Sequence, residues 1–261
     1  MISKLEVTGL CYSYHSMAGE TQALSDISFQ VEEGEFTAIV GPSGCGKSTL
    51  LSILCGLLKP DQGTIRLNGE PLQGTSPKIG YMLQKDHLFE WRSIFSNACL
   101  GLEIRGKRNK EGEEKVVHLL DDYGLLPFKN ARPSELSGGM RQRSALIRTL
   151  ALEPDVLLLD EPFSALDYQT RLSVCDDISS IIRGTKKTAI LVTHDLSEAV
   201  SVADRIIVLS QRPGRIKAVL PISFSDPELR PLERRNAPEF PGYFNQVWKC
   251  LENREVLHEQ S

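Results

Sequence analysis

The sequence predicts an α/β fold in which a helical segment interrupts a core of strands and helices. Continuous apolar runs at 156–159, 188–192 and 206–209 are typical of strands buried on both faces of a parallel sheet. Between about 91 and 152 the apolar side chains instead recur at helical spacing. Because strand patterns stand before and after this stretch, we expect the helices at 91–152 to be an insertion.

The first third of the chain predicts short strands joined by turns. Apolar and polar residues alternate over 5–10, 27–31 and 36–40, and acidic residues with a glycine separate the last two runs. The segment 64–69 alternates in the same way and ends in Asn-Gly, a strong hairpin signal. A further strand is expected at 79–83.

Composition excludes several classes of protein. The 261 residues carry a formal net charge of −4, which gives no bulk attraction to nucleic acid, and 41% are hydrophobic, as in ordinary globular proteins. No run of about 18 apolar residues occurs, and the N-terminus lacks the apolar core of a secretory signal. The six cysteines are not spaced for zinc, so reduced and mostly buried thiols in a cytoplasmic protein are expected.

A glycine-rich loop follows the strand predicted at 36–40 and precedes a helix predicted at 47–56. Its sequence fits the G-x-x-x-x-G-K-[ST] pattern that binds the phosphates of a nucleoside triphosphate: Gly41, Pro42, Ser43, Gly44, Cys45, Gly46, Lys47, Ser48 and Thr49. Backbone N–H groups of 44–49 are expected around the β-phosphate, with the Lys47 amine at the β- and γ-phosphates. The Ser48 hydroxyl is the candidate Mg²⁺ ligand.

Two acidic residues, Asp160 and Glu161, follow the apolar run at 156–159. Asp160 ends the strand and is expected near the Mg²⁺ ion. Glu161 is one residue further on and points elsewhere, which suits a general base for the attacking water. With the glycine-rich loop, this pair predicts a protein that binds ATP and Mg²⁺ and hydrolyses the ATP.

The segment 136–143, Leu-Ser-Gly-Gly-Met-Arg-Gln-Arg, is a third motif and predicts a capped helix start suited to a phosphate. In combination and order, these motifs resemble an ATP-binding cassette (ABC) transporter nucleotide-binding subunit, and the resemblance covers essentially the whole chain. It implies a RecA-like P-loop NTPase core with an antiparallel β subdomain and a helical insertion at about 91–152. The ABC domain would span 1–235, and a helical tail would span 236–261.

The resemblance implies further site residues. Tyr14 lies where the family stacks an aromatic ring on adenine, with Tyr12 as the alternative. Gln84 resembles the glutamine that touches Mg²⁺ and links the core to the helical insertion. His194 resembles the histidine that contacts the γ-phosphate and the attacking water.

Other residues are implied to act across a dimer of two copies. Ser137, Gly138 and Gly139 resemble the signature motif, which faces the γ-phosphate bound by the opposite subunit, and Met140 replaces the more frequent glutamine. Asp167 resembles the loop that crosses the dimer seam. ATP would close this head-to-tail dimer, and hydrolysis would reopen it.

The segment 84–93 resembles the nitrate, sulfonate and taurine importer branch, and so does 212–216. That branch implies transmembrane permease subunits, an extracytoplasmic solute-binding protein and a peripheral place on the cytoplasmic face of the membrane. A soluble ABC ATPase of iron–sulfur assembly or DNA maintenance, and an exporter subunit, are the alternatives.

Two further expectations concern the loop and the tail. Cys45 is expected to be shielded from thiol reagents by bound ATP. Prolines recur after Arg212 and predict an irregular C-terminal segment, closed by a short helix near 243–251.

Overall fold

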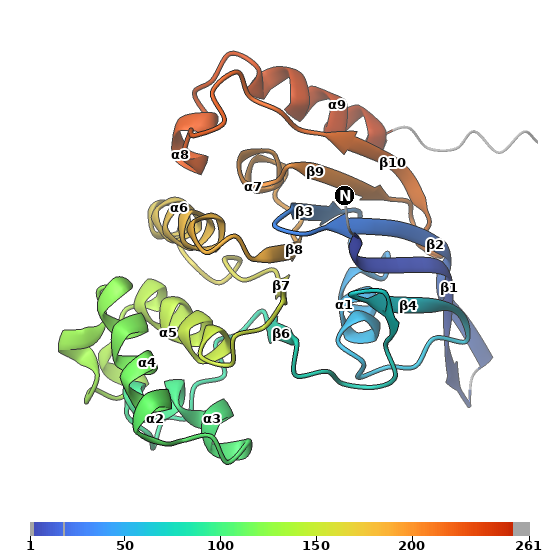
Figure 1. Cartoon of the computed structure of the whole chain (residues 1–261). Helices are drawn as coiled ribbons and strands as arrows, with labels where there is room; N and C mark the ends of the chain where they lie inside the picture. Colours follow the sequence, from blue (N-terminus) through green and yellow to red (C-terminus); the bar gives the residue numbers. More distant parts are fainter. Residues whose placement is uncertain (1–2, 18, 253–261) are drawn as a thin grey trace, which may run out of the picture.

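A computed structural model describes residues 3–17 and 19–252, which form two β-sheets with helices around them (Figure 1). The larger sheet has six strands in the order β10-β9-β3-β8-β7-β6. Its strands are β3 (Phe36–Val40), β6 (Ile79–Met82), β7 (Val156–Asp160), β8 (Thr188–Val192), β9 (Arg205–Leu209) and β10 (Ile216–Pro221). The first five run parallel to one another and β10 runs antiparallel to β9, which confirms the α/β prediction.

The central strands need cover on both faces. Every residue of β3, β7 and β8 is buried, as the continuous apolar runs predicted. Side chains alternate along each strand, so Leu158 packs toward α1 while Leu157 and Leu159 pack toward the helices on the other face. Helix α1 (Lys47–Leu54) covers one of these faces and begins directly after the loop that follows β3.

The second sheet is antiparallel and lies beside α1 (Figure 1). Its order is β2-β1-β4-β5, formed by β1 (Ser3–Ser16), β2 (Gly19–Glu32), β4 (Gln62–Leu67) and β5 (Glu70–Pro71). The Asn68-Gly69 pair turns β4 into β5 with both residues at positive φ, 53° and 79°. This sheet and α1 share one apolar core with the central strands, and the expected antiparallel β region is confirmed.

Between β6 and β7 the chain is helical, as predicted. This stretch contains α2 (Ile94–Ala98), α3 (Leu100–Ile104), α4 (Lys110–Asp122), two 3₁₀ turns (Leu126–Phe128 and Pro133–Glu135) and α5 (Gly138–Leu150). Ser93, Asn109 and Ser137 cap α2, α4 and α5 through side-chain oxygens. These helices pack together and, through α5, against α6 (Tyr168–Gly184).

The prediction of an irregular segment after Arg212 is wrong in part. Strand β10 and helix α8 (Pro231–Arg234) lie in it, and the closing helix α9 (Phe240–Glu252) is longer than predicted. The prolines are compatible with this order because Pro221 ends an edge strand and Pro231 opens a helix. Helix α9 packs on β9, β10 and α7 (Leu196–Val202); residues 253–261 of the expected tail lie outside the described residues.

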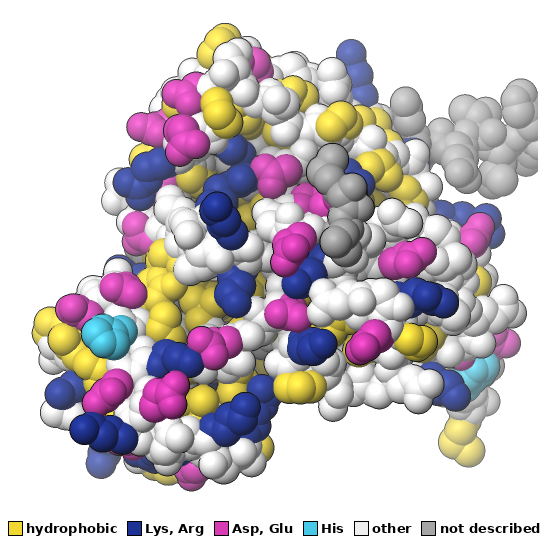
Figure 2. Space-filling view, in the orientation of Figure 1, with side chains coloured by type: hydrophobic (Ala, Val, Ile, Leu, Met, Phe, Trp, Pro, Cys, Tyr) yellow, Lys and Arg dark blue, Asp and Glu magenta, His cyan; other side chains and the backbone are white. Residues whose placement is uncertain are grey.

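Surface and thiol chemistry agree with the composition. Acidic and basic side chains are interspersed over the face shown in Figure 2. Cys45, Cys55, Cys99 and Cys175 are buried, Cys11 and Cys250 are partly buried, and all six are free thiols. Each helix of the described chain is too short or too polar to cross a membrane.

Candidate functional site

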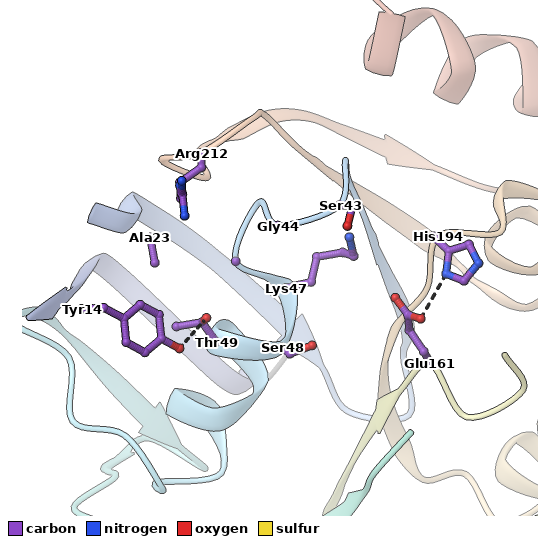
Figure 3. A pocket seen from close by; sticks show the side chains of 11 residues that line it. Tyr14, Ala23, Ser43, Gly44, Lys47, Ser48, Thr49, Glu161, His194 and Arg212 are labelled. Atoms are coloured by element: carbon purple, nitrogen blue, oxygen red, sulfur yellow. Dashed lines mark hydrogen bonds and ion pairs between the residues drawn. The ribbon is translucent and has the colours of Figure 1, made fainter. Parts of the chain in front are cut away.

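A cavity of about 600 Å³ opens where the loop after β3 meets α1 (Figure 3). The residues that line it come from both sheets, the glycine-rich loop and the ends of β7 and β8: Tyr14, Ala23, Ser43, Gly44, Gly46, Lys47, Ser48, Thr49, Glu161, His194 and Arg212. Nine of these were predicted from the sequence. The parallel sheet brings Glu161 and His194 together because β7 and β8 are neighbours that end at the same edge.

The loop from Gly41 to Gly46 wraps around the Lys47 amine. Lys47 Nζ donates to the carbonyl oxygens of Gly41 at 2.8 Å and Pro42 at 3.0 Å. Gly46 has φ 103°, and a Cβ there would lie 2.7 Å from a Leu24 methyl and 3.0 Å from the Ala23 carbonyl oxygen. Only glycine combines that φ with so close an approach, and the result is an ammonium group held inside a loop of backbone N–H groups, a polyphosphate-binding arrangement.

Asp160 is buried next to the cavity and contacts Ser48, which lines it, so that two oxygen ligands lie together. Ser48 Oγ donates to Asp160 Oδ1 at 3.1 Å, and the Tyr81 hydroxyl donates to Oδ2 at 3.1 Å. Burial raises the pKa of the Asp160 carboxyl, and the hydrogen bonds from Tyr81 and Ser48 oppose that shift. Burial beside Asp160 also raises the pKa of Tyr81, so its phenol stays a donor.

Glu161 turns away from Asp160 and toward β8. Its backbone has φ 44°, an uncommon conformation for a residue with a side chain, and its N–H donates to Val192 O at 2.9 Å. Glu161 Oε2 lies 3.1 Å from His194 Nδ1 (Figure 3). A carboxylate bonded to Nδ1 fixes the imidazole orientation and leaves Nε2 free, so the pair can orient a water and accept its proton.

Gln84 lies beside the cavity and is absent from its lining. Its Nε2 donates to Ser164 Oγ at 3.2 Å and lies 3.4 Å from Glu161 Oε2. The Ser164 hydroxyl in turn donates to the Glu161 carbonyl oxygen at 3.0 Å. Gln84 is thus linked to Glu161 rather than to the Ser48–Asp160 pair.

Tyr14 and Tyr12 have different surroundings. The Tyr14 ring is 46% exposed and lines the cavity, and its hydroxyl lies 3.0 Å from Thr49 Oγ1. Tyr12 packs against the core of the antiparallel sheet, with its ring edge-on to Tyr14 at 5.0 Å between centroids. Of the two, Tyr14 has the ring face that a nucleobase can reach.

The start of α5 lies apart from this cavity. Ser137 is exposed, and its Oγ accepts a hydrogen bond from Met140 N at 3.4 Å. Gly139 is buried against α6, where a Cβ would lie 2.7 Å from a Val174 methyl. Asp167 caps α6 by accepting from Thr170 N at 3.1 Å, and hydrogen bonding from the Thr170 side chain and backbone lowers the pKa of its carboxyl. Ser137, Gly138, Gly139 and Asp167 are therefore outside the cavity of their own chain.

The structure removes the basis for the expectation about Cys45. Its side chain is only 1% exposed, and burial raises the pKa of the thiol. A buried thiol that resists ionisation reacts slowly whether or not a nucleotide is bound. Gly41 and Pro42 are likewise outside the lining and face Lys47 through their carbonyl oxygens.

Two lining residues were not predicted as site residues. Ala23 lies on β2, one residue before the buried Leu24. Arg212 lies on the loop after β9. An arginine three residues after a strand of the parallel sheet is a weak signal, and only the folding of that loop onto β2 places it here.

A protein-family model described as ABC transporter matches residues 24–164. The chain belongs to the ABC transporter family. It is 43% identical to a taurine import ATP-binding protein of Jannaschia sp. over 84% of each chain. It is also 40% identical to a nitrate import ATP-binding protein of Synechocystis sp., over 97% of this chain and 96% of the relative. These matches confirm the predicted ABC ATPase of the nitrate and taurine importer branch.

Solved ABC structures have the same fold. A dimeric ATP-binding cassette, MJ0796, in a post-hydrolysis state with ADP and phosphate matches with a TM-score of 0.72 and 29% identity. The match covers 84% of this chain and 99% of that one. The prediction of an ATP-binding cassette that hydrolyses ATP is confirmed.

Proposed function

We propose that this ABC ATPase powers the uptake of a small solute of the sulfonate or nitrate type. The observation that carries the proposal is the single cavity that joins the phosphate loop to Glu161 and His194. The solute class rests on kinship to the taurine and nitrate importers, because the solute itself is expected to pass through other subunits.

Within this cavity we assign ATP binding to the phosphate loop and to Tyr14. The Lys47 amine and the N–H groups of 44–49 bind the phosphates, and the exposed Tyr14 ring stacks on adenine. Glu161 accepts the proton of the attacking water, and His194 holds Glu161 in place through its Nδ1–H.

The oxygens of Ser48 and Asp160 fit a Mg²⁺ ion. Hard divalent cations take hydroxyl and carboxylate oxygens, and these two residues lie 3.1 Å apart at the phosphate loop. The ion would neutralise charge on the phosphate oxygens when bound. Gln84 contacts Glu161 rather than this pair, so we assign it to the side of the site where water is activated.

We further propose that two copies form a head-to-tail dimer around two ATP molecules. Ser137, Gly138 and Gly139 of one copy would face the γ-phosphate held by the other, and Asp167 would lie at the seam. All four residues lie outside the cavity of their own chain, and Ser137 and Asp167 are exposed, which supports this arrangement, as does the dimeric state of the related cassette. Each chain would then supply one half of each site.

The assembly would include transmembrane permease subunits and an extracytoplasmic solute-binding protein, with this chain on the cytoplasmic face of the membrane. An affinity purification from detergent-solubilised native membranes, followed by mass spectrometry, tests this. We expect a multi-span permease and a solute-binding protein among the partners. Recovery of soluble partners alone would contradict the transport proposal and leave the ATPase assignment standing.

A further inference from the structure

The loop between β9 and β10 carries Arg212 to the edge of the nucleotide cavity. The Arg212 side chain is exposed and lines the cavity beside Ala23 and the phosphate loop (Figure 3). Among the described residues its guanidinium has no hydrogen-bond or ion-pair partner. An exposed guanidinium without a protein partner, beside an anion-binding loop, is available to bind an anionic ligand.

The backbone of this loop is fixed to its surroundings. Gly214 N donates to Ala23 O at 2.9 Å, and Ser25 N donates to Gly214 O at 2.9 Å. A Cβ on Gly214 would lie 2.2 Å from the Cys45 carbonyl oxygen, so the loop lies directly on the phosphate loop. Arg212 is thus two residues from an anchor that contacts both β2 and the nucleotide-binding loop.

The loop is also held from within. The Ser210 hydroxyl bonds to the carbonyl oxygens of Gln211 at 2.9 Å and Pro213 at 3.2 Å, and it accepts from Arg215 N at 3.0 Å. The position of the Arg212 backbone therefore does not depend on any contact of its own side chain. Its guanidinium is free to bind a ligand at no cost in broken protein contacts.

The position of Arg212 indicates which part of the nucleotide it meets. Figure 3 shows Arg212 and Tyr14 on one side of the phosphate loop, with Glu161 and His194 on the other. The hydrolytic end of the triphosphate belongs beside Glu161. Arg212 therefore lies nearer the end that carries the ribose and the first phosphates.

We infer that Arg212 is a second cationic ligand of ATP, and that its guanidinium donates to α- or β-phosphate oxygens opposite the buried Lys47 amine. This inference rests on the proposed nucleotide site. A planar guanidinium matches phosphate geometry and is always charged. Because both phosphates are present in ADP, the contact strengthens ATP and ADP binding alike and leaves the hydrolytic step unchanged.

Calorimetric titration of ATP, ADP and GTP into the full chain tests the inference with R212A, R212Q and R212K. We expect Kd to rise about 5- to 20-fold for R212A and R212Q, equally for ATP, ADP and GTP, since a charge-assisted bond at an exposed site is lost. R212K keeps the charge and should recover most of the affinity. R215A is the matched control, because Arg215 is an exposed arginine of the same loop outside the cavity lining.

Three results would overturn the inference. Unchanged Kd in R212A would show that the guanidinium does not contact the nucleotide. A loss confined to ATP, with ADP unaffected, would move the contact to the γ-phosphate. A changed preference between ATP and GTP would make Arg212 a base contact. Parallel titration of Lys47→Ala separates these outcomes from failure of the proposed site, which would leave that variant unaffected as well.

Discussion

The phosphate loop and the start of α5 are both helix N-termini rich in serine and glycine, yet their surroundings differ. At α1, Lys47 is 7% exposed and its amine is bonded to two carbonyl oxygens of the loop. At α5, the exposed Ser137 makes a single cap bond at 3.4 Å. The first helix start lines a cavity together with Glu161 and His194, and the second lies outside it.

Burial and a complete set of polar contacts distinguish a prepared ligand site from half of one. The α1 region holds its charged groups in place within one chain, through Ser48–Asp160 and Glu161–His194. The α5 region presents N–H groups and a hydroxyl whose phosphate would come from another copy. Substitutions at the two helix starts should therefore affect different steps.

The largest effect is expected for Glu161→Gln, which removes the proposed base and keeps the side-chain shape. We expect ATP hydrolysis to slow about 10²- to 10⁴-fold, the usual contribution of a positioned base, with nucleotide affinity close to that of wild type. A phosphate-release assay and a binding titration measure the two. The closed ATP-bound dimer should also accumulate in size-exclusion chromatography with ATP.

The control for that experiment is Glu70→Gln, an exposed glutamate on β5 outside the cavity lining. Turnover of Glu161→Gln near the wild-type rate would show that another group accepts the proton. Glu161 would then not be the residue that performs the chemistry beside α1.

Lys47→Ala tests the role of the phosphate loop in nucleotide binding. The amine is the buried cation of the loop, so its removal should weaken ATP binding about 10- to 100-fold, the worth of a charge-assisted hydrogen bond. Lys59→Ala, an exposed lysine shortly after α1, should bind as wild type does. Equal affinity in the two variants would mean that the backbone N–H groups alone hold the phosphates.

Ser137→Ala should separate binding from hydrolysis at the other helix start. We expect about a 10-fold slower ATPase at saturating ATP, because a hydroxyl donor to the γ-phosphate is lost, with nucleotide affinity of the isolated chain unchanged. Removing the cap should also cost about 1 kcal/mol of stability, so the melting temperature is measured alongside. Ser134→Ala removes an exposed serine nearby and should alter neither quantity.

A weakened ATP affinity of monomeric Ser137→Ala would contradict the division between the two regions. It would place the signature motif in the site of its own chain. The same loss in Ser134→Ala would point to general destabilisation of the turn before α5.

Most of the site at the start of α1 could be predicted, because the sequence motifs that form it are local. A strand, a glycine loop and a helix follow one another in the sequence, and the acidic pair stands directly after a buried strand. Helix α6 received no prediction, since its buried face includes the polar Asp176 and Ser179 and weakens the apolar pattern. Strand β10 was missed because the prolines around it predict irregular structure.

Arg212 shows the limit of local signals for the site. It reaches the cavity through the packing of Gly214 on Ala23 and Cys45, residues about 170 to 190 positions earlier in the chain. The local sequence predicts the turn, but it does not indicate which part of the protein the turn packs against. The Cys45 thiol is a similar case, because it is buried in the core that the antiparallel sheet and α1 share with the central strands.

An effect on stability rather than on turnover is expected behind His194, where Glu198 is 3% exposed in α7. The Thr193 hydroxyl donates to Glu198 Oε2 at 2.5 Å, and Asp195 N donates to Thr193 Oγ1 at 3.0 Å, so this carboxyl supports the loop that carries His194. Burial raises the pKa of Glu198 to about 7; Asp195 adds to the shift and Arg171 and Arg235 oppose it.

The raised pKa fixes the sign of the pH dependence. The folded protein holds this proton more tightly than the unfolded chain, so the stabilisation is complete below the unfolded pKa of 4.5 and is lost as pH rises through about 7. In the wild type the free energy of unfolding should fall by on the order of 2 kcal/mol between pH 5 and 8 because of this group, and Glu198→Gln should remove that fall. Urea unfolding at several pH values measures it. Glu228→Gln, at an exposed glutamate, is the control and should keep the fall. An unchanged slope in Glu198→Gln would mean that the carboxyl titrates alike in the folded and unfolded protein, and that its burial in α7 does not perturb its pKa.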